Sequence, residues 1–129
     1  MLSPQIFADY LLTVPLGLNK LARRGFNQSW EIARNIQVPK TVRKIPDAIG
    51  RRGDEAPQAT LNRAMRKEKM EGMFYLNTNW CGRFKDRTVI VFDDVMTSGA
   101  TMNAIAALLK REGAKHVSAW VVLRTLPKP

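Results

Sequence analysis

Two adjacent carboxylates and a short hydroxyl-rich loop form the most chemically informative stretch of this sequence. Asp93 and Asp94 follow the apolar run 89–92, which is typical of a buried parallel strand. A Thr-Ser-Gly sequence at 97–99 then leads into a segment with a helical apolar stripe, formed by Met102, Ile105, Ala106, Leu108 and Leu109. In an open α/β sheet, ligands bind beyond the carboxyl ends of the strands. The acids and the loop therefore lie where a ligand would bind.

The residue types in this stretch suit a phosphorylated sugar. A helix N-terminus offers unpaired N–H groups and the positive end of the helix dipole, and Gly99 lets the backbone approach a phosphate closely. The two carboxylates would repel a second phosphate, but they can accept hydrogen bonds from sugar hydroxyls or help to hold a hydrated cation. A ribose 5-phosphate along this turn suits both parts of the stretch: its hydroxyls suit the carboxylates, and its phosphate suits the helix N-terminus. The alternative is a solvated acidic turn followed by an ordinary Ser/Thr helix cap.

The chain carries a strong positive charge. It has 21 Lys and Arg residues against 11 Asp and Glu residues, which gives a net charge of +10. The segment 20–69 holds most of this excess. Such a field attracts polyanions, so nucleic acid and a heavily phosphorylated small molecule are both candidate partners. A solvated basic surface without a partner is the simpler alternative.

Length and composition predict one globular domain over residues 1–129. No stretch approaches the ~20 apolar residues of a membrane span, and the N-terminus lacks a secretory signal pattern. We therefore expect a cytoplasmic protein without membrane insertion. The single cysteine, Cys81, cannot form an internal disulfide or a zinc cage, and we expect it to be inert on the apolar side of its segment. His116 alone makes no metal site.

Hydrophobic periodicity predicts alternating strands and helices. The expected strands span 10–14, 41–49, 73–76, 89–92 and 117–123; the expected helices span 28–36 and 61–71, and a last helix opens from the 97–101 loop and runs to 112. Asn27 is the expected cap of the first helix, Gly113 ends the last one, and Pro46 indicates an edge strand or a bulge. Residues 51–60 show no periodicity and predict a loop. This alternation favours a parallel sheet covered on both faces.

The stretch 89–101 resembles the phosphoribosyl-diphosphate (PRPP) binding signature of type I phosphoribosyltransferases. The resemblance implies a doubly wound, mostly parallel α/β sheet with a flexible hood loop. It also implies PRPP as the ligand, with Mg²⁺ held mainly by that ligand and not by direct protein ligation. Asp93 and Asp94 take the catalytic role. The implied ribose and 5-phosphate site comprises Asp93, Asp94, Val95, Met96, Thr97, Ser98, Gly99, Ala100 and Thr101.

The segments 14–16 and 23–28 resemble a narrower group, the ComF family, which includes GntX-like proteins and is associated with bacterial DNA uptake. The region 51–74 resembles the hood of the same family. The implied diphosphate-binding residues are Leu16, Gly17, Leu18, Lys20, Arg23 and Arg24, and the implied hood residues are Gln58, Arg63 and Arg66. A basic surface loop and a solvated basic helix are the respective alternatives.

The sequence differs from this family in one respect. ComF-like proteins commonly begin with a cysteine-rich zinc-binding segment and a helix, and neither pattern occurs here. We expect either a shortened member or the C-terminal portion of a longer product. A missing first helix would leave one sheet face partly bare, which favours a homo-oligomer or a partner that covers that face.

Three functions remain open at this point. The first is a magnesium-dependent phosphoribosyltransferase that acts on an unidentified acceptor. The second is a PRPP-binding module without turnover. The third is a DNA-uptake accessory factor that contacts single-stranded DNA or proteins of the competence machinery. Five aromatic residues could stack on bases, although most of them are better explained as core; they are Phe26, Trp30, Phe74, Tyr75 and Trp80.

Overall fold

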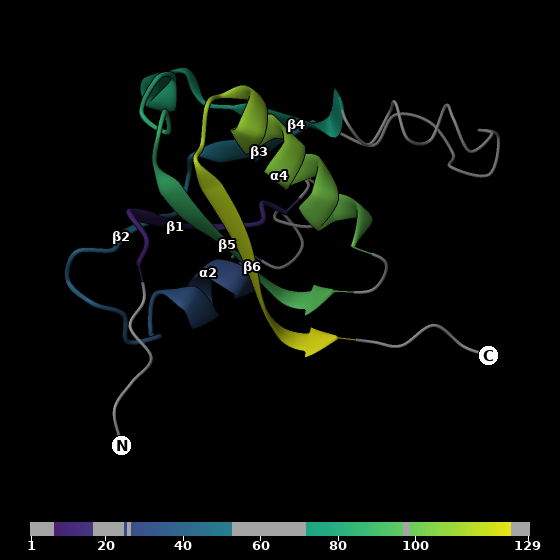
Figure 1. Cartoon of the computed structure of the whole chain (residues 1–129). Helices are drawn as coiled ribbons and strands as arrows, with labels where there is room; N and C mark the ends of the chain where they lie inside the picture. The colour runs from purple at the N-terminus through teal and green to yellow at the C-terminus, as the bar shows by residue number, and fades with distance from the viewer. Residues whose placement is uncertain (1–6, 17–24, 26, 53–71, 97–98, 125–129) are drawn as a thin grey trace, which may run out of the picture.

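A computed structural model describes residues 7–16, 25, 27–52, 72–96 and 99–124 of the chain (Figure 1). The elements in chain order are β1 (Tyr10–Thr13), α2 (Gln28–Ala33), β2 (Arg43–Ile45), β3 (Ile49–Arg51), β4 (Phe74–Leu76), the 3-10 turn η2 (Thr78–Trp80), β5 (Thr88–Met96), α4 (Ala100–Arg111) and β6 (His116–Arg124). The helix expected at 61–71 and most of the loop expected at 51–60 lie outside the described residues.

Four strands form a parallel sheet in the order β2-β1-β5-β6. From β1 the chain passes through α2 to β2 on one side, and from β5 it passes through α4 to β6 on the other. Figure 1 shows α4 and the small antiparallel sheet of β3 and β4 on one side of this sheet, and α2 on the opposite side. The prediction of a doubly wound, mostly parallel sheet is confirmed. Its direction of winding reverses between β1 and β5, where such folds bind ligands.

The core consists of two clusters, one on each face of the sheet. Because successive strand residues point to opposite faces, Leu12 and Val91 join the cluster beneath α4, while Leu11 and Ile90 join the cluster beneath α2. Buried residues of α4 complete the first cluster; they are Met102, Ala104, Ile105, Leu108 and Leu109. The predicted stripe of α4 is thus confirmed, except that Ala104 replaces Ala106, which is only half-buried.

One predicted strand is divided into two. The segment expected as a strand over 41–49 forms β2 at the edge of the parallel sheet and then β3 in the second sheet. Pro46 follows β2 directly and has no N–H to extend the ladder, which explains the break. Of the two alternatives that Pro46 indicated, the edge strand is confirmed, because β2 lies at the edge of the sheet. The first helix is also shorter than expected, because α2 ends at Ala33 and residues 34–36 form turns.

Three smaller expectations can be compared directly. Cys81 is exposed, so its predicted place on an apolar side is wrong: it directly follows η2, in a polar turn. His116 begins the edge strand β6 and is exposed. Among the described residues, no group of three or more potential ligands could hold a metal ion. In the same part of the chain, no helix has the length and apolar character needed to span a bilayer.

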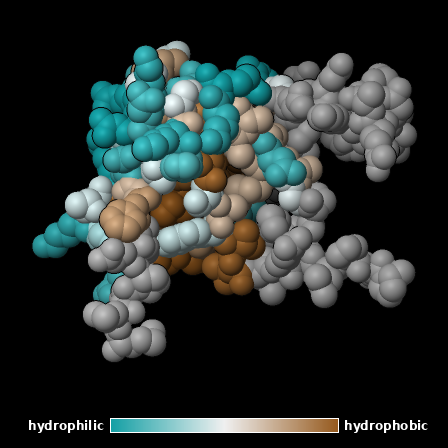
Figure 2. All heavy atoms as spheres, viewed as in Figure 1, coloured by the Kyte–Doolittle hydropathy of each residue, from teal (hydrophilic) through white to brown (hydrophobic). Residues whose placement is uncertain are grey.

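The face of the sheet that carries α2 is only partly covered. A hollow of about 460 Å³ between the end of α2 and β6 is lined by Ile36, Phe92, Ala119, Trp120, Val121 and Val122. Val122 is 62% exposed. Figure 2 shows apolar residues gathered in the lower centre of this view, over the region of α2 and β6. The predicted second copy or partner on this face stays a prediction.

Candidate functional site

The acidic pair lies within β5. We expected the carboxylates to follow the strand, but β5 continues through Met96 because its pairing with β6 extends to Met96 and Arg124. Asp93 pairs in register with Val121 of β6. Both carboxylates therefore stand on the carboxyl-terminal part of a central strand, which holds them more rigidly than a turn would.

The carboxyl-terminal end of β1 lies beside this pair. Thr13 of β1 is in register with Phe92, and the Val14 N–H donates to the Phe92 carbonyl at 3.0 Å. The described chain then continues to Leu16, which is half-buried. Asn27 brings the chain back, because its side-chain N–H group donates to the Val14 carbonyl at 3.2 Å. The segment between Leu16 and Asn27 thus starts and ends at the point where the sheet winding reverses.

Helix α2 contributes a hydroxyl to the acidic pair. The Ser29 Oγ lies 2.9 Å from Asp94 Oδ1 and 3.3 Å from Asp93 Oδ1. Burial, together with a hydrogen bond and the negative charge of Asp94, raises the pKa of Asp93 from 3.8 to about 6. The Ser29 hydrogen bond acts in the opposite direction. The half-buried pair therefore holds a proton under mildly acidic conditions.

We expect Asp93→Asn to stabilise the protein above pH 6. The unfolded chain loses this proton near pH 4, whereas the folded chain retains it up to about pH 6, so folding opposes ionisation. A shift of this size corresponds to about 3 kcal/mol in full; partial solvent exposure reduces the expected gain to about 1–2 kcal/mol at pH 8. Urea unfolding of the wild-type protein and of Asp93→Asn at pH 8 and pH 4 measures this difference in the free energy of unfolding.

The advantage of the variant should shrink as the pH falls towards 4, because the folded wild-type group is then protonated and the unfolded one is about half protonated. A free energy of unfolding that differs by the same amount at both pH values would contradict this assignment. Asp86→Asn is a matched control, because Asp86 is exposed in the turn that precedes the same strand.

A glycine connects β5 to the helix that follows. Gly99 adopts the left-handed conformation, with φ 82°, and is the N-cap of α4. Its carbonyl accepts the Asn103 N–H at 2.8 Å. The predicted glycine turn at a helix N-terminus is confirmed, and the twelve-residue helix supplies a dipole directed at this end. Ala100 and Thr101 form its first turn.

Several predicted site residues have only partial descriptions or none. Val95 and Met96 belong to β5. The residues that lie outside the described part of the chain are Thr97, Ser98, Gly17, Leu18, Lys20, Arg23, Arg24, Gln58, Arg63 and Arg66. The described site therefore consists of the acidic pair, Ser29, the end of β1 and the Gly99 cap.

Comparison with known proteins identifies the family. Residues 21–128 match the phosphoribosyl transferase domain. The chain belongs to this family. The resemblance to ComF-type proteins is also confirmed, because this phosphoribosyl transferase domain is similar to proteins named for competence and DNA utilization.

Three relatives illustrate the similarity. The DNA utilization protein YhgH of Escherichia coli O6:H1 is 35% identical over 118 residues, covering 92% of this chain and 50% of the relative. Competence protein F of Haemophilus influenzae is 28% identical over 123 residues, with 90% and 50% covered. Competence protein ComFC of Streptococcus pneumoniae is 28% identical over 113 residues, with 88% and 47% covered. The chain thus spans about half the length of the curated relatives it matches.

Two polar residues of the phosphoribosyl transferase domain site were not predicted from the sequence. The sequence pattern places Ser29 in a helix without indicating a role, whereas in the structure it is 4% exposed and contacts the acids. Thr13, at the end of β1, is also 4% exposed, and its hydroxyl has no hydrogen-bond partner among the described residues. The sequence signal that could have identified them is a polar residue at the end of an apolar strand and a polar residue in the first turn of a helix.

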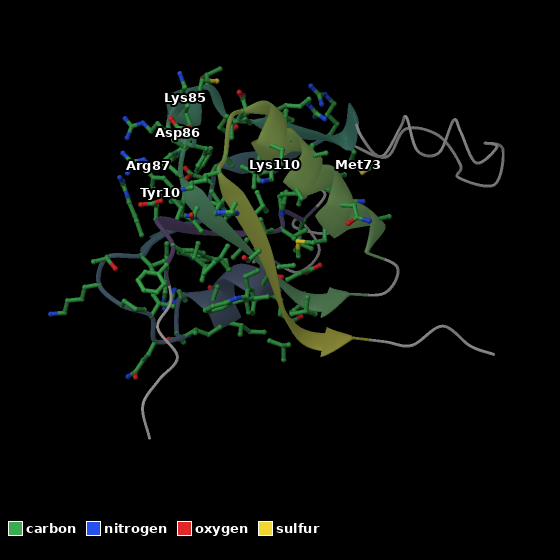
Figure 3. The ribbon with its side chains drawn as sticks, viewed as in Figure 1. Tyr10, Met73, Lys85, Asp86, Arg87 and Lys110 are labelled. Atoms are coloured by element: carbon green, nitrogen blue, oxygen red, sulfur yellow. The ribbon has the colours of Figure 1, made fainter. Side chains whose placement is uncertain are left out.

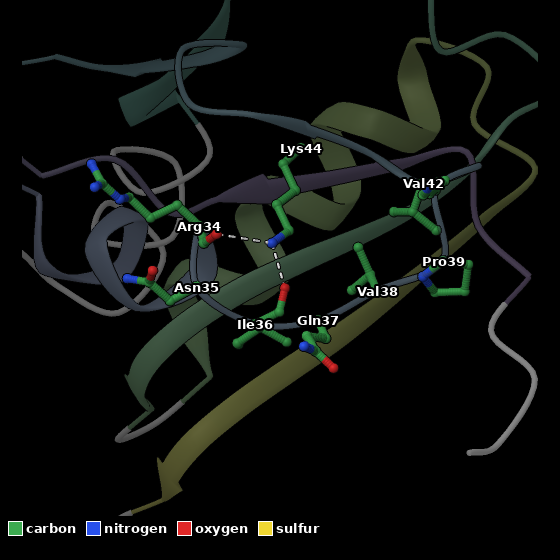
Figure 4. A pocket seen from close by; sticks show the side chains of 9 residues that line it. Arg34, Asn35, Ile36, Gln37, Val38, Pro39, Val42 and Lys44 are labelled. Atoms are coloured by element: carbon green, nitrogen blue, oxygen red, sulfur yellow. Dashed lines mark hydrogen bonds between the residues drawn. The ribbon is translucent and has the colours of Figure 1, made fainter. Parts of the chain in front are cut away.

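Another hollow, of about 680 Å³, lies at the end of α2 (Figure 4). Lys44 lines it, and its ammonium group donates to the Arg34 carbonyl at 3.1 Å and to the Ile36 carbonyl. A lysine that satisfies the last carbonyls of a helix stabilises its C-terminus. We assign this cation a structural role in the phosphoribosyl transferase domain.

Proposed function

We propose that the chain binds PRPP where the sheet winding reverses and transfers its phosphoribosyl group to an unidentified acceptor, with release of diphosphate. One observation carries this proposal: Asp93 and Asp94 lie near the end of β5, and the left-handed Gly99 that caps α4 follows them within a few residues. Hydrogen-bond acceptors for sugar hydroxyls therefore lie only a few residues before a helix N-terminus that suits a phosphate.

The roles of the residues follow from their chemistry. Asp93 and Asp94 accept hydrogen bonds from the ribose hydroxyls, and their negative charge favours positive character at C1 as the bond to diphosphate breaks. The nucleophilic atom of the acceptor forms a new bond to C1, and diphosphate leaves with the bonding electron pair. Thr97 to Thr101 hold the 5-phosphate. Leu16 to Leu18, with Lys20, Arg23 and Arg24, hold the diphosphate, since guanidinium groups match its oxygens in pairs.

The donor set fits a magnesium ion that is carried by the substrate. Two carboxylates stand together, and no third potential ligand joins them among the described residues. Mg²⁺ retains water and prefers phosphate oxygens, so it needs no cage of protein ligands. When bound, it neutralises charge on the departing diphosphate. Gln58, Arg63 and Arg66 are the hood residues proposed to exclude water from the activated sugar.

The biological role that we propose is DNA uptake or utilization in the cytoplasm. The relatives bear the names DNA utilization protein and competence protein. The exposed free thiol of Cys81 agrees with a reducing compartment. Because the chain spans about half of these relatives, the activity of the whole protein belongs to the same proposal.

Calorimetric titration with PRPP in the presence of Mg²⁺ tests the proposal. We expect saturable binding, weaker binding of ribose 5-phosphate, and no binding of free ribose, because the phosphate and the hydroxyls are recognised together. Diphosphate release, measured over a panel of free bases, distinguishes turnover from binding alone. Absence of PRPP binding at millimolar concentration would overturn the proposal.

A specific groove favours a second function, the binding of single-stranded DNA. It has a volume of about 350 Å³ and lies between β2 and the turn at 79–83. The guanidinium carbons of Arg43 and Arg83 lie 5.2 Å and 5.3 Å from the ring centre of Trp80. Surfaces that bind single strands combine a basic groove with aromatic side chains, and this groove contains both.

The surface around this groove is polar. Figure 3 shows Lys85 and Arg87 together with Asp86 and Tyr10, at the end of the sheet where β5 begins. Arg87 is engaged with Asp9, whose carboxylate lies 3.6 Å away. Figure 2 shows hydrophilic residues over the same upper left part of the view. This end of the sheet is opposite to the acidic pair, so a strand of DNA and PRPP could bind together.

We expect the double variant Arg43→Gln/Arg83→Gln to bind labelled oligothymidine about tenfold more weakly at 0.1 M salt. The slope of log Kd against log salt should fall by about 1.4, because two phosphate contacts are lost. Fluorescence anisotropy measures both quantities. Arg34→Gln/Arg111→Gln removes two exposed arginines elsewhere and is the charge-matched control. Equal losses in both double variants would show that only the general positive field attracts DNA.

A further inference from the structure

Ser29 occupies an unusual position for a serine in a helix. It lies in the first turn of α2 and is 4% exposed. Its hydroxyl oxygen is 2.9 Å from Asp94 Oδ1 and 3.3 Å from Asp93 Oδ1, and it accepts the backbone N–H of Asp94 at 3.3 Å. These contacts join residues that are 64 and 65 positions apart in the sequence.

Capping of the helix does not explain this hydroxyl. Asn27 already caps α2, because its side-chain oxygen accepts the N–H groups of Ser29 and Trp30 at 3.0 Å and 3.4 Å. The hydroxyl of Ser29 is therefore available for the sheet. A buried hydroxyl is unfavourable unless it is hydrogen-bonded, and here its partners are the two carboxylates of the candidate site.

We propose that Ser29 is a positioning residue that holds Asp93 and Asp94 in the geometry required to receive the ribose hydroxyls; this inference rests on the proposed function. Two adjacent carboxylates repel each other, and a hydroxyl between them offsets part of that repulsion. A fixed rotamer of Asp94 also removes a conformational cost from ligand binding. Asn27 ties the same helix turn to the end of β1 through Val14.

Among the described residues of the neighbouring elements, no charged side chain is seen to take the place of Ser29 in holding the two carboxylates. On α2, the Glu31 carboxylate is directed to Arg34, with 3.8 Å between Oε1 and Nη1. On the adjacent strands, Val121 of β6 is in register with Asp93, and Thr13 of β1 is in register with Phe92, the residue before the pair; neither carries a charge. The first turn of α4 contains no acidic residue, and its cations Lys110 and Arg111 lie in the last turn.

Ser29→Ala tests the proposal. Alanine is the best helix former, so α2 should persist. Carbon-13 NMR of the aspartate carboxyl groups, assigned with Asp93→Asn and Asp94→Asn, follows the titration without any ligand. We expect the Asp93 titration to move to higher pH in Ser29→Ala, because a hydrogen bond that favours the charged form is lost. PRPP affinity should fall about tenfold at pH 7, and less at pH 8.5.

Two further variants separate positioning from simple stability. Ser29→Thr keeps the hydroxyl and should restore the wild-type titration. Ser118→Ala removes an exposed hydroxyl from β6 and should change neither the titration nor the affinity. An unchanged Asp93 titration in Ser29→Ala would overturn the inference. If the wild-type protein fails to bind PRPP, the proposed function fails, while the ligand-free titration still decides whether Ser29 controls the pair.

Discussion

Asp94→Asn is expected to lower PRPP affinity and diphosphate release by about a hundredfold or more. A hydrogen bond to a charged group contributes about 1.5–3 kcal/mol, and a ribose offers two hydroxyls to this pair. The amide has nearly the same shape as the carboxylate, so the position of the side chain on β5 should be retained. Calorimetry with PRPP and Mg²⁺, followed by a diphosphate-release assay, gives the two ratios.

Asp86→Asn is the matched control for this experiment. Both substitutions raise the net charge by one, so any change in the long-range attraction of PRPP is the same. Asp86 lies at the opposite end of the sheet, just before β5, and adopts φ 60°, a conformation that asparagine tolerates. We expect Asp86→Asn to change PRPP affinity and diphosphate release by less than twofold. Similar affinities for the two variants would contradict the assignment of the acidic pair to the ribose.

The parts of the fold with strong periodicity could be predicted from the sequence. The apolar run 89–92 and the stripe of α4 each lie within a single element. The hydrophobic periodicity of that element shows which of its residues are buried, so the local sequence predicts them well. Asn27 and Gly113 were recognisable as helix ends, and the structure gives them those roles. The acidic pair and Gly99 were recognisable because their spacing follows one strand and one turn.

Features that depend on contacts between distant segments were not predictable. The Ser29 contact with Asp93 and Asp94 requires α2 to pack against the carboxyl-terminal part of β5, and no local sequence pattern predicts that packing. The division of 41–49 into β2 and β3 required a second sheet to receive Ile49. The burial of Phe84 has no local signal either, because charged residues flank it and its segment shows no periodicity.

Phe84→Ala is expected to be the most destabilising single substitution proposed, because Phe84 is fully buried although it lies in a loop. Its ring meets Tyr10 edge-on at 5.3 Å and stacks on Trp80 at 5.9 Å. Truncation of a buried phenylalanine costs about 3–5 kcal/mol, which is a large part of the total stability of a small domain. Urea unfolding followed by circular dichroism measures the loss.

Phe7→Ala provides the control with the same chemical change, since Phe7 is 79% exposed and should lose less than about 0.5 kcal/mol. The comparison also tests the link between the loop and the site. Phe84 packs against Tyr10 of β1 and lies four residues before β5, the two strands whose far ends carry Thr13 and the acidic pair. A loss below about 1 kcal/mol for Phe84→Ala would mean that this aromatic cluster does not anchor those strands.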